Sequence, residues 1–203
     1  GTKESGPIKM PVALIDVLAA HQLKEGLLLA LLKKEKTKKG SLVEVSLYDT
    51  ALASLKNQAT NWLMNNFIPE RIGSLHPNIA PYGETFKTKD GFLLVLAIGT
   101  DKHFKMLLSI LKADKIGLKK KFYNNQLRVS NRIELAKELQ PLFESKTKDE
   151  LMPSFLKQNI PVGVIRNIKE VFEKNIAKNL ILNEKIEEID TKRVKTAIFK
   201  ISD

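Results

Sequence analysis

The chain has 203 residues, of which 43% are hydrophobic, so it holds enough apolar material for one large domain or two small ones. Cysteine is absent, which excludes a disulfide framework, a thiolate nucleophile and a cysteine-ligated zinc. The net charge of +11 is compatible with nucleic-acid binding, but most basic residues are lysines, spread among 23 acidic residues and few aromatics. We therefore favour a solvated, lysine-rich surface and predict no nucleic-acid partner.

The sequence also argues against a metal site and a membrane anchor. The three histidines stand at positions 21, 76 and 103, without the spacing of metal ligands. The longest apolar run, residues 27–32, is far too short to span a bilayer. Residues 1–10 are polar and lack the apolar core of a signal peptide. We therefore predict no metal, no membrane partner and a cytoplasmic location.

The chain is organised around residues 11–49, where an apolar run, residues 12–15, ends at Asp16 and an apolar helix is predicted over residues 17–34. A carboxylate at the start of a buried-looking helix is normally either satisfied locally or kept for chemistry, because burying a charge is costly. Asp16 could be the N-cap of this helix, a nucleophile, or both. Gly26 lowers the helix propensity, which indicates close packing against a neighbour.

A basic turn follows the helix and is predicted to end at Gly40 in the left-handed conformation. Residues 42–47 alternate as a strand does, and Asp49 is predicted to cap a second helix over residues 50–67. Residues 68–81 contain three prolines and form the predicted connector between two domains.

The second half of the chain begins with a predicted β-hairpin, because residues 85–87 and 92–98 flank the turn dipeptide Asp90-Gly91. Asp101 is predicted to cap the helix that follows. The next expected elements are a helix over 102–112, an irregular basic segment over 113–129 and a helix over 130–144. A helix with a Thr147/Glu150 capping box should follow, and Pro153 should kink or shorten it. After it we expect a short apolar run at 162–165, a helix near 168–174, and strands near 180–189 and 194–201.

Four segments carry a family resemblance. Residues 30–49 read ALLKKEKTKKGSLVEVSLYD, residues 76–83 read HPNIAPYG, residues 89–91 read KDG, and residues 98–101 read IGTD. With an aspartate ahead of an apolar helix, and in this order and spacing, they resemble the class III CoA-transferase family. That family includes formyl-CoA transferase, carnitine CoA-transferases and α-methylacyl-CoA racemase.

The resemblance implies an α/β fold of which this chain carries a part. Residues 1–67 would be the C-terminal part of a Rossmann-like large domain with a linker helix and the catalytic aspartate. Residues 68–81 would be the linker, and residues 82–203 a small α+β domain with an antiparallel sheet and helices. Because members of the family are considerably longer and begin with the half that binds CoA, we expect a fragment that lacks that half.

The resemblance also implies roles for individual residues. Asp16 matches the aspartate that acts as the nucleophile in the transferases and forms a covalent aspartyl-CoA intermediate. Tyr82, Gly83, Gly99 and Thr100 match positions expected to bind substrate. The expected activity is the transfer of CoA from an acyl-CoA thioester to a carboxylic acid.

The implied partners are substrates and a second copy of the chain. Coenzyme A is expected as a substrate, and no permanently bound cofactor is expected. Family members form interlocked homodimers, and such a dimer would cover the apolar stripe of the helix predicted over residues 50–67, including Trp62.

Two alternatives stay open. A racemase would use the same aspartate as an acid/base, paired with a histidine that would lie upstream of this chain, and would carry a glutamate in the turn that here reads Gly99-Thr100-Asp101. This turn is closer to the transferases' Gly-Asn-Asp. A chain without the CoA-binding half could instead be a non-catalytic dimerising fragment. His21 replaces a residue that is often small in the family, and we do not favour a catalytic role for it.

Overall fold

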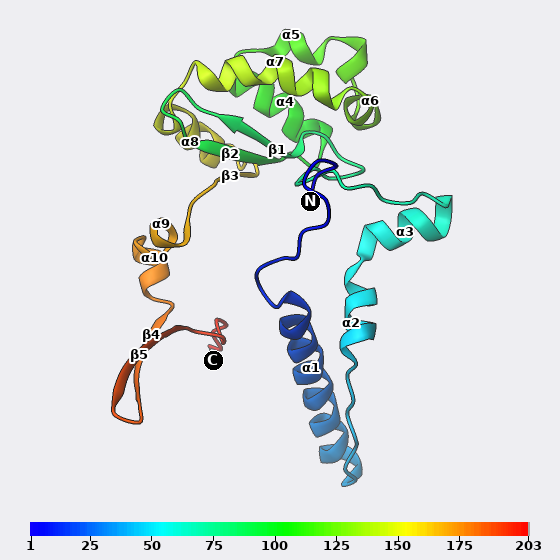
Figure 1. Cartoon of the computed structure of the whole chain (residues 1–203), viewed down its shortest axis with the longest axis vertical. Helices are drawn as coiled ribbons and strands as arrows, with labels where there is room; N and C mark the ends of the chain where they lie inside the picture. The colour runs from blue at the N-terminus through cyan, green and yellow to red at the C-terminus, as the bar shows by residue number, and fades with distance from the viewer. Residues whose placement is uncertain (203) are drawn as a thin grey trace. The chain divides into compact units, whose positions relative to one another are not determined.

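The computed structural model describes residues 1–202, and the chain divides into two compact units, Gly1–Pro77 and the part from Asn78 onward. Figure 1 shows both units. The division falls inside the segment 68–81 that the sequence predicts as a connector. The assignment of the first unit to the end of a Rossmann-like domain stays a prediction.

The first unit begins with helix α1, Leu14–Thr37, which starts three residues earlier than the sequence predicts. Its N-cap is Ala13, and no side chain makes a capping hydrogen bond there. Of the two roles left open for Asp16, the N-cap is therefore excluded. Asp16 instead lies inside the first turn, where the partial positive charge of the helix N-terminus favours an acidic side chain.

The prediction that this helix is buried is also wrong within the single chain. Ala19 is its buried residue, whereas the leucines at positions 23, 27, 28, 29, 31 and 32 are between 39% and 63% exposed. The physical reason is geometric: apolar side chains point in all directions around the axis, but the first unit supplies a neighbour on one side. That neighbour is α2 together with the segment before it.

The end of α1 and the segment after it differ from the prediction. Lys38, not Gly40, adopts the left-handed conformation, with φ of 59°, and its N–H donates to the carbonyl of Lys34. The segment predicted as a strand at 42–47 is irregular, because no strand within residues 1–202 pairs with it. The close packing predicted at Gly26 is confirmed: a Cβ there would lie 2.7 Å from Cγ1 of Val43.

Two short helices, α2 (Leu47–Ser54) and α3 (Lys56–Asn65), replace the single helix predicted over 50–67. Ser46 caps α2 by accepting a hydrogen bond from the Asp49 N–H, so Asp49 is not the cap. The break falls at Lys56, whose φ of 45° is incompatible with a continuous right-handed helix. Trp62 on α3 is 47% exposed within the first unit.

The second unit is built on a three-stranded antiparallel sheet in the order β1-β2-β3, formed by Tyr82–Lys87, Leu93–Ala97 and Val162–Val164. The predicted hairpin is confirmed. Its turn is fixed by the Thr88 hydroxyl, which donates to Asp90 at 2.6 Å, and by Gly91, whose φ of 84° suits glycine. This mixture of helices and antiparallel strands confirms the predicted fold class.

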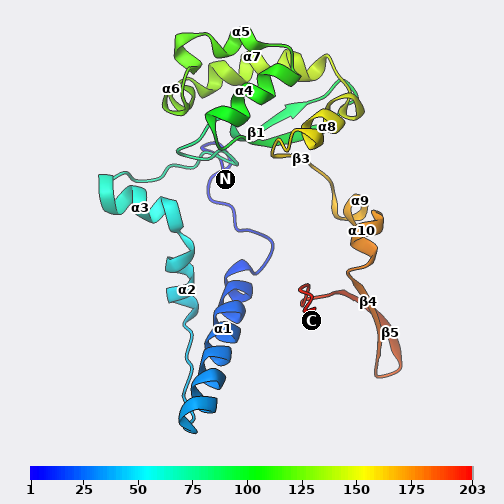
Figure 2. The same cartoon turned by 180° about the vertical axis from the view of Figure 1, so that it is seen from behind.

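Helices cover one side of this sheet and bury a common core with it (Figures 1 and 2). They are α4 (Asp101–Ile110), α5 (Asp114–Gly117), the 3-10 turn η1 (Lys120–Phe122), α6 (Asn125–Ser130), α7 (Arg132–Glu144) and α8 (Lys148–Lys157). At the centre, the rings of Phe86 and Phe143 stack with centroids 4.6 Å apart, and Phe155 packs on Phe143. Leu94 and Leu139 are fully buried beside them.

Side-chain caps account for several helix starts. Thr100, not Asp101, caps α4 and accepts from the His103 N–H. The predicted capping box of Thr147 and Glu150 is confirmed, with both reciprocal hydrogen bonds present. Pro153 lies inside α8 without ending it.

Further differences concern boundaries. The helix predicted from residue 130 begins at Arg132, and residues 113–129, predicted as irregular, contain α5, η1 and most of α6.

The chain continues with α9 (Ile168–Phe172), α10 (Asn175–Lys178) and a hairpin of β4 (Ile181–Ile186) and β5 (Ile189–Val194). The second strand begins at Ile189, whereas the sequence predicts it near 194–201, five residues too late at its start. The reason is the turn: Glu187 and Glu188 both adopt positive φ, at 48° and 64°, without the Asn or Gly that usually marks such a turn.

Among residues 1–202, no helix combines the length and hydrophobicity that crossing a membrane requires.

We predict that Leu139→Ala destabilises the second unit by about 2–5 kcal/mol, because the side chain is fully buried and its loss leaves a cavity. The matched control is Leu156→Ala on α8, where the leucine is 65% exposed and the expected change is below about 0.5 kcal/mol. Urea unfolding measures both, and equal effects at the two positions would contradict the core described above.

Candidate functional site

The segment 78–83 of the second unit lies against helices α6 and α7 and is held through its backbone. The Nδ2 of Asn125 donates to the carbonyl of Asn78 at 2.8 Å, and the N–H of Ala80 donates to Oδ1 of the same side chain at 3.2 Å. Ala80 is fully buried, and the peptide bond between it and Pro81 is cis. One side chain therefore satisfies two polar groups of residues 78–80, which lie before strand β1 and have no regular secondary structure.

Arg128 is the most deeply buried charged side chain of the described chain, with 1% of its surface exposed. Its Nε donates to the Ala80 carbonyl at 2.9 Å, and its Nη1 donates to the Phe122 carbonyl at 3.3 Å. Its Nη2 pairs with Oδ1 of Asp101 at 2.6 Å, and the guanidinium lies over the Phe104 ring at 4.3 Å. The charge is thus neutralised and hydrogen-bonded, as burial requires.

A second arginine, at the start of α7, continues this pattern. Arg132 donates to the Ile79 carbonyl at 2.9 Å and to Oε1 of Glu84 at 3.0 Å. Glu84 is 7% exposed, and its Oε2 has no hydrogen-bond partner among residues 1–202. Burial raises the pKa of the Glu84 carboxyl above its ordinary value, although the Arg132 guanidinium acts in the opposite direction.

The structure brings together four residues that the resemblance assigns to substrate binding. Tyr82 pairs with Ala97 across the sheet, and the Ile98 N–H donates to the Pro81 carbonyl at 3.1 Å. Gly99 and Thr100 follow directly on that strand. The register shifts between Tyr82 and Thr85, and Gly83 adopts a φ of 89°. Tyr82 and Gly83 therefore lie at the same end of the sheet as the turn formed by Gly99 and Thr100.

The side chains that hold this region are absent from the sequence-based prediction. Asn125 and Arg128 belong to a segment predicted to be basic and irregular, and Arg132 lies in the helix predicted over residues 130–144. The spacing of three residues between Asn125 and Arg128 is the signal that could have identified a helix there, since it places both side chains on one face. It was hidden because that stretch lacks a long apolar periodicity.

Asp16 lies in the first unit, near the start of α1. Its side chain is exposed, and no hydrogen bond or ion pair to it is found among residues 1–202. It shares a helix face with Ala20, Leu23 and Leu27, which lie four, seven and eleven residues further along. The result is one carboxylate at the N-terminal end of an exposed apolar stripe. His21 is exposed on the same helix.

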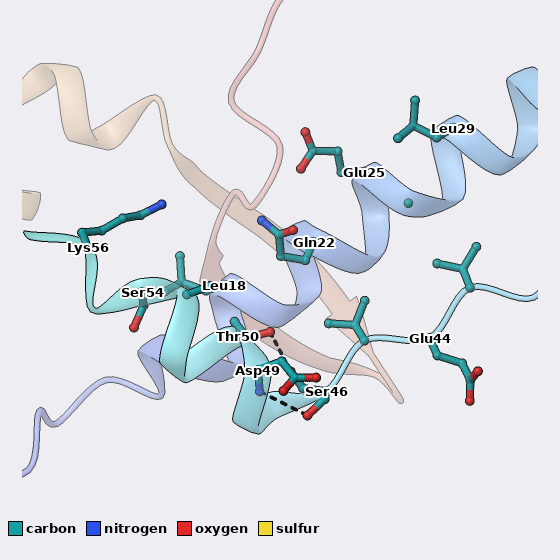
Figure 3. Close-up of a pocket in the computed structure, with 14 residues that line it drawn as sticks. Leu18, Gln22, Glu25, Leu29, Glu44, Ser46, Asp49, Thr50, Ser54 and Lys56 are labelled. Atoms are coloured by element: carbon teal, nitrogen blue, oxygen red, sulfur yellow. Dashed lines mark hydrogen bonds between the residues drawn. The ribbon is translucent and has the colours of Figure 1, made fainter. Parts of the chain in front are cut away.

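A groove of about 750 Å³ lies on another side of α1, between this helix and α2 with the segment before it. Figure 3 shows Gln22, Glu25 and Leu29 projecting from α1 across from Asp49 on α2. The lining contains three carboxylates and one lysine, namely Glu25, Glu44, Asp49 and Lys56, and does not include Asp16. Such a lining does not suit the phosphates of coenzyme A, which bind to cationic donors.

No cluster of three or more histidine, cysteine, aspartate or glutamate residues that could hold a metal ion is found in the part of the chain that the structure describes.

Comparison with known proteins places the chain in a family. The model of CoA-transferase family III matches residues 1–203, so the chain belongs to this family. It is 35% identical over 172 residues to an acyl-CoA transferase of Fusarium pseudograminearum and 33% identical over 172 residues to the human succinyl-CoA:glutarate CoA-transferase. These matches cover 85% of this chain but 37% and 39% of the two relatives, so the chain spans less than half the length of either.

Solved structures show a similar fold. A CAIB/BAIF family protein from Brucella suis is similar over 100% of this chain and 52% of its own, with 29% identity and a TM-score of 0.70. Rv3272 from Mycobacterium tuberculosis aligns over 98% of this chain and 52% of its own, with a TM-score of 0.80 and 23% identity, a likeness of fold alone.

The buried Glu84 carboxyl leads to a prediction about pH. Because its pKa is raised on folding, the folded state binds this proton more tightly than the unfolded state, and stability falls as the pH rises from the ordinary value of 4.5 through the folded pKa. Relative to Glu84→Gln, the wild-type chain should lose free energy of unfolding over this interval, by at most about 1.4 kcal/mol per pH unit.

Urea unfolding between pH 4 and pH 7 measures this difference. The exposed Glu173→Gln serves as the control, and its curve should run parallel to the wild type. A wild-type chain that gains stability relative to Glu84→Gln as the pH rises would contradict the raised pKa.

Proposed function

We propose that the chain is the part of an acyl-CoA:carboxylate CoA-transferase that carries the nucleophile, Asp16. Membership of CoA-transferase family III supports the reaction class. The observation that supports the residue is its placement: an exposed carboxylate without an ion-pair partner among residues 1–202, in the first turn of a long helix. A nucleophilic carboxylate must be ionised and uncovered on its reactive side, and the N-terminal end of a helix favours the anion.

In the proposed reaction, the Asp16 carboxylate attacks the carbonyl carbon of the acyl-CoA, the C–S bond breaks, and the CoA thiolate leaves a mixed anhydride. The thiolate then attacks the aspartyl carbonyl carbon and releases the donor acid as its carboxylate, which leaves an aspartyl-CoA thioester. The acceptor carboxylate displaces the thiolate to give a second anhydride. The thiolate finally attacks the acceptor's acyl carbon, so that the new acyl-CoA and free Asp16 are formed.

Tyr82, Gly83, Gly99 and Thr100 are proposed to bind substrate. Their arrangement at one end of the three-stranded sheet supports this role, since sites built on rigid elements hold their geometry better than sites on free loops. The names of the similar proteins include succinyl-CoA:glutarate and acetyl-CoA:oxalate CoA-transferases. We propose short dicarboxylic acids as the class of acceptor.

We predict that Asp16→Asn, made in the whole protein, lowers the rate of CoA transfer at least about a hundredfold without unfolding the protein, because an amide cannot replace the carboxylate as nucleophile. The control is Glu35→Gln, which changes another acidic side chain of α1 that is 79% exposed. Turnover is measured by separating the two acyl-CoA species, and an Asp16→Asn enzyme with more than a few per cent of wild-type turnover would contradict the assignment.

We also propose that the chain assembles as a homodimer, with the apolar stripe of α2 and α3 covered by the partner. Leu52, Leu55, Trp62, Leu63 and Phe67 are each between 47% and 76% exposed in the single chain, which supports a covering partner.

The dimer predicts a protected Trp62, the single tryptophan of the chain. Light scattering should give twice the mass of the chain, and acrylamide should quench the Trp62 fluorescence less at high protein concentration than at low. A monomer at high micromolar concentration whose Trp62 is freely quenched, as its 47% exposure in the single chain allows, would contradict the proposal.

A further inference from the structure

We propose that Asn125, Arg128 and Arg132 are positioning residues for the transfer reaction, which hold the segment 78–83 in its working geometry. Together they are called the loop clamp below. The inference rests on the proposed function, since it concerns how Tyr82 and Gly83 are presented to substrate.

The first argument is the completeness of the clamp. Its three side chains satisfy four backbone groups of three consecutive residues: the carbonyls of residues 78, 79 and 80 and the N–H of residue 80. No regular secondary structure satisfies these groups, and at the buried Ala80 unpaired backbone groups would be costly. Because the contacts are to the backbone, they fix the path of the segment without depending on its side chains.

The second argument is that the clamp joins both parts of the proposed substrate site. Arg128 binds the Ala80 carbonyl with Nε and the Asp101 carboxylate with Nη2. Ala80 lies two residues before Tyr82, and Asp101 follows Thr100. One planar guanidinium with fixed donor directions therefore sets the position of the segment relative to the turn.

The third argument excludes a direct role in binding. Arg128 is 1% exposed, and its donors are directed to two carbonyls and a carboxylate of the protein. Arg132 is likewise paired with Glu84 and the Ile79 carbonyl. These guanidinium groups are held by the protein itself, so we infer that they act on substrate through the segment they hold.

Asn125 offers the most direct test, because it is only half-buried and its replacement should not unfold the core. In the whole protein, Asn125→Ala removes both hydrogen bonds to the segment. We expect kcat/KM to fall by about tenfold or more, since small misplacements of a site cost up to about a hundredfold. The melting temperature should stay near that of the wild type.

Hydrogen-exchange mass spectrometry of peptides spanning residues 76–83 reports the clamp independently of activity. The Ala80 amide should exchange faster in Asn125→Ala than in the wild type. In Asn125→Asp, which keeps the acceptor for this amide, protection should return, together with part of the lost activity. Gln126→Ala, an exposed neighbour on α6, is the control and should change neither measurement.

The outcomes separate the two proposals. Faster exchange in Asn125→Ala with unchanged kcat/KM would show a purely structural contact and overturn the positioning role. Unchanged exchange would overturn the clamp itself. A wild-type protein without CoA-transferase activity would overturn the proposed function and with it the role in catalysis, while the exchange data would still decide whether the segment is held.

Discussion

The burial of the Arg128 guanidinium is the interaction on which the second unit depends. A buried charge without partners is so costly that removing one member of a buried pair typically destabilises a protein by about 3–5 kcal/mol. Here the Asp101 carboxylate, the carbonyls of Ala80 and Phe122 and the Phe104 ring surround it. These groups come from three separate stretches of chain, so their common partner fixes a connector, the start of α4 and a 3-10 turn relative to one another.

The two units bury their apolar residues in different ways. In the second unit, strands and helices close around Phe86, Leu139 and Phe143, and the polar clamp lies beside this core. In the first unit, α1 carries leucines on all sides and is covered on one side only. The residues proposed to contact substrate therefore lie on a unit with its own hydrophobic core. The proposed nucleophile lies on a helix whose remaining apolar surface is exposed in this chain.

The predictable features were those fixed by neighbours in the sequence. Asp90-Gly91 specifies a hairpin, Thr147 and Glu150 specify a capping box, and the family motif identifies Asp16 as a candidate. Helix caps are harder to predict where two polar residues stand near the expected helix start. Thr100 caps α4 and Ser46 caps α2, where Asp101 and Asp49 were expected, because the capping oxygen must reach the N–H three residues further along. The clamp could not be predicted from local sequence, since it joins residues about fifty positions apart.

The proposed mechanism requires a covalent link at Asp16 during CoA transfer, and this link can be trapped. Trypsin should release residues 10–24, a peptide in which Asp16 is the one carboxylic side chain. When the whole protein is incubated with acyl-CoA and hydroxylamine, an anhydride or thioester at Asp16 would become a hydroxamate. Our account predicts this mass change on the 10–24 peptide, dependent on acyl-CoA. A hydroxamate on another peptide, or none during active turnover, would contradict it.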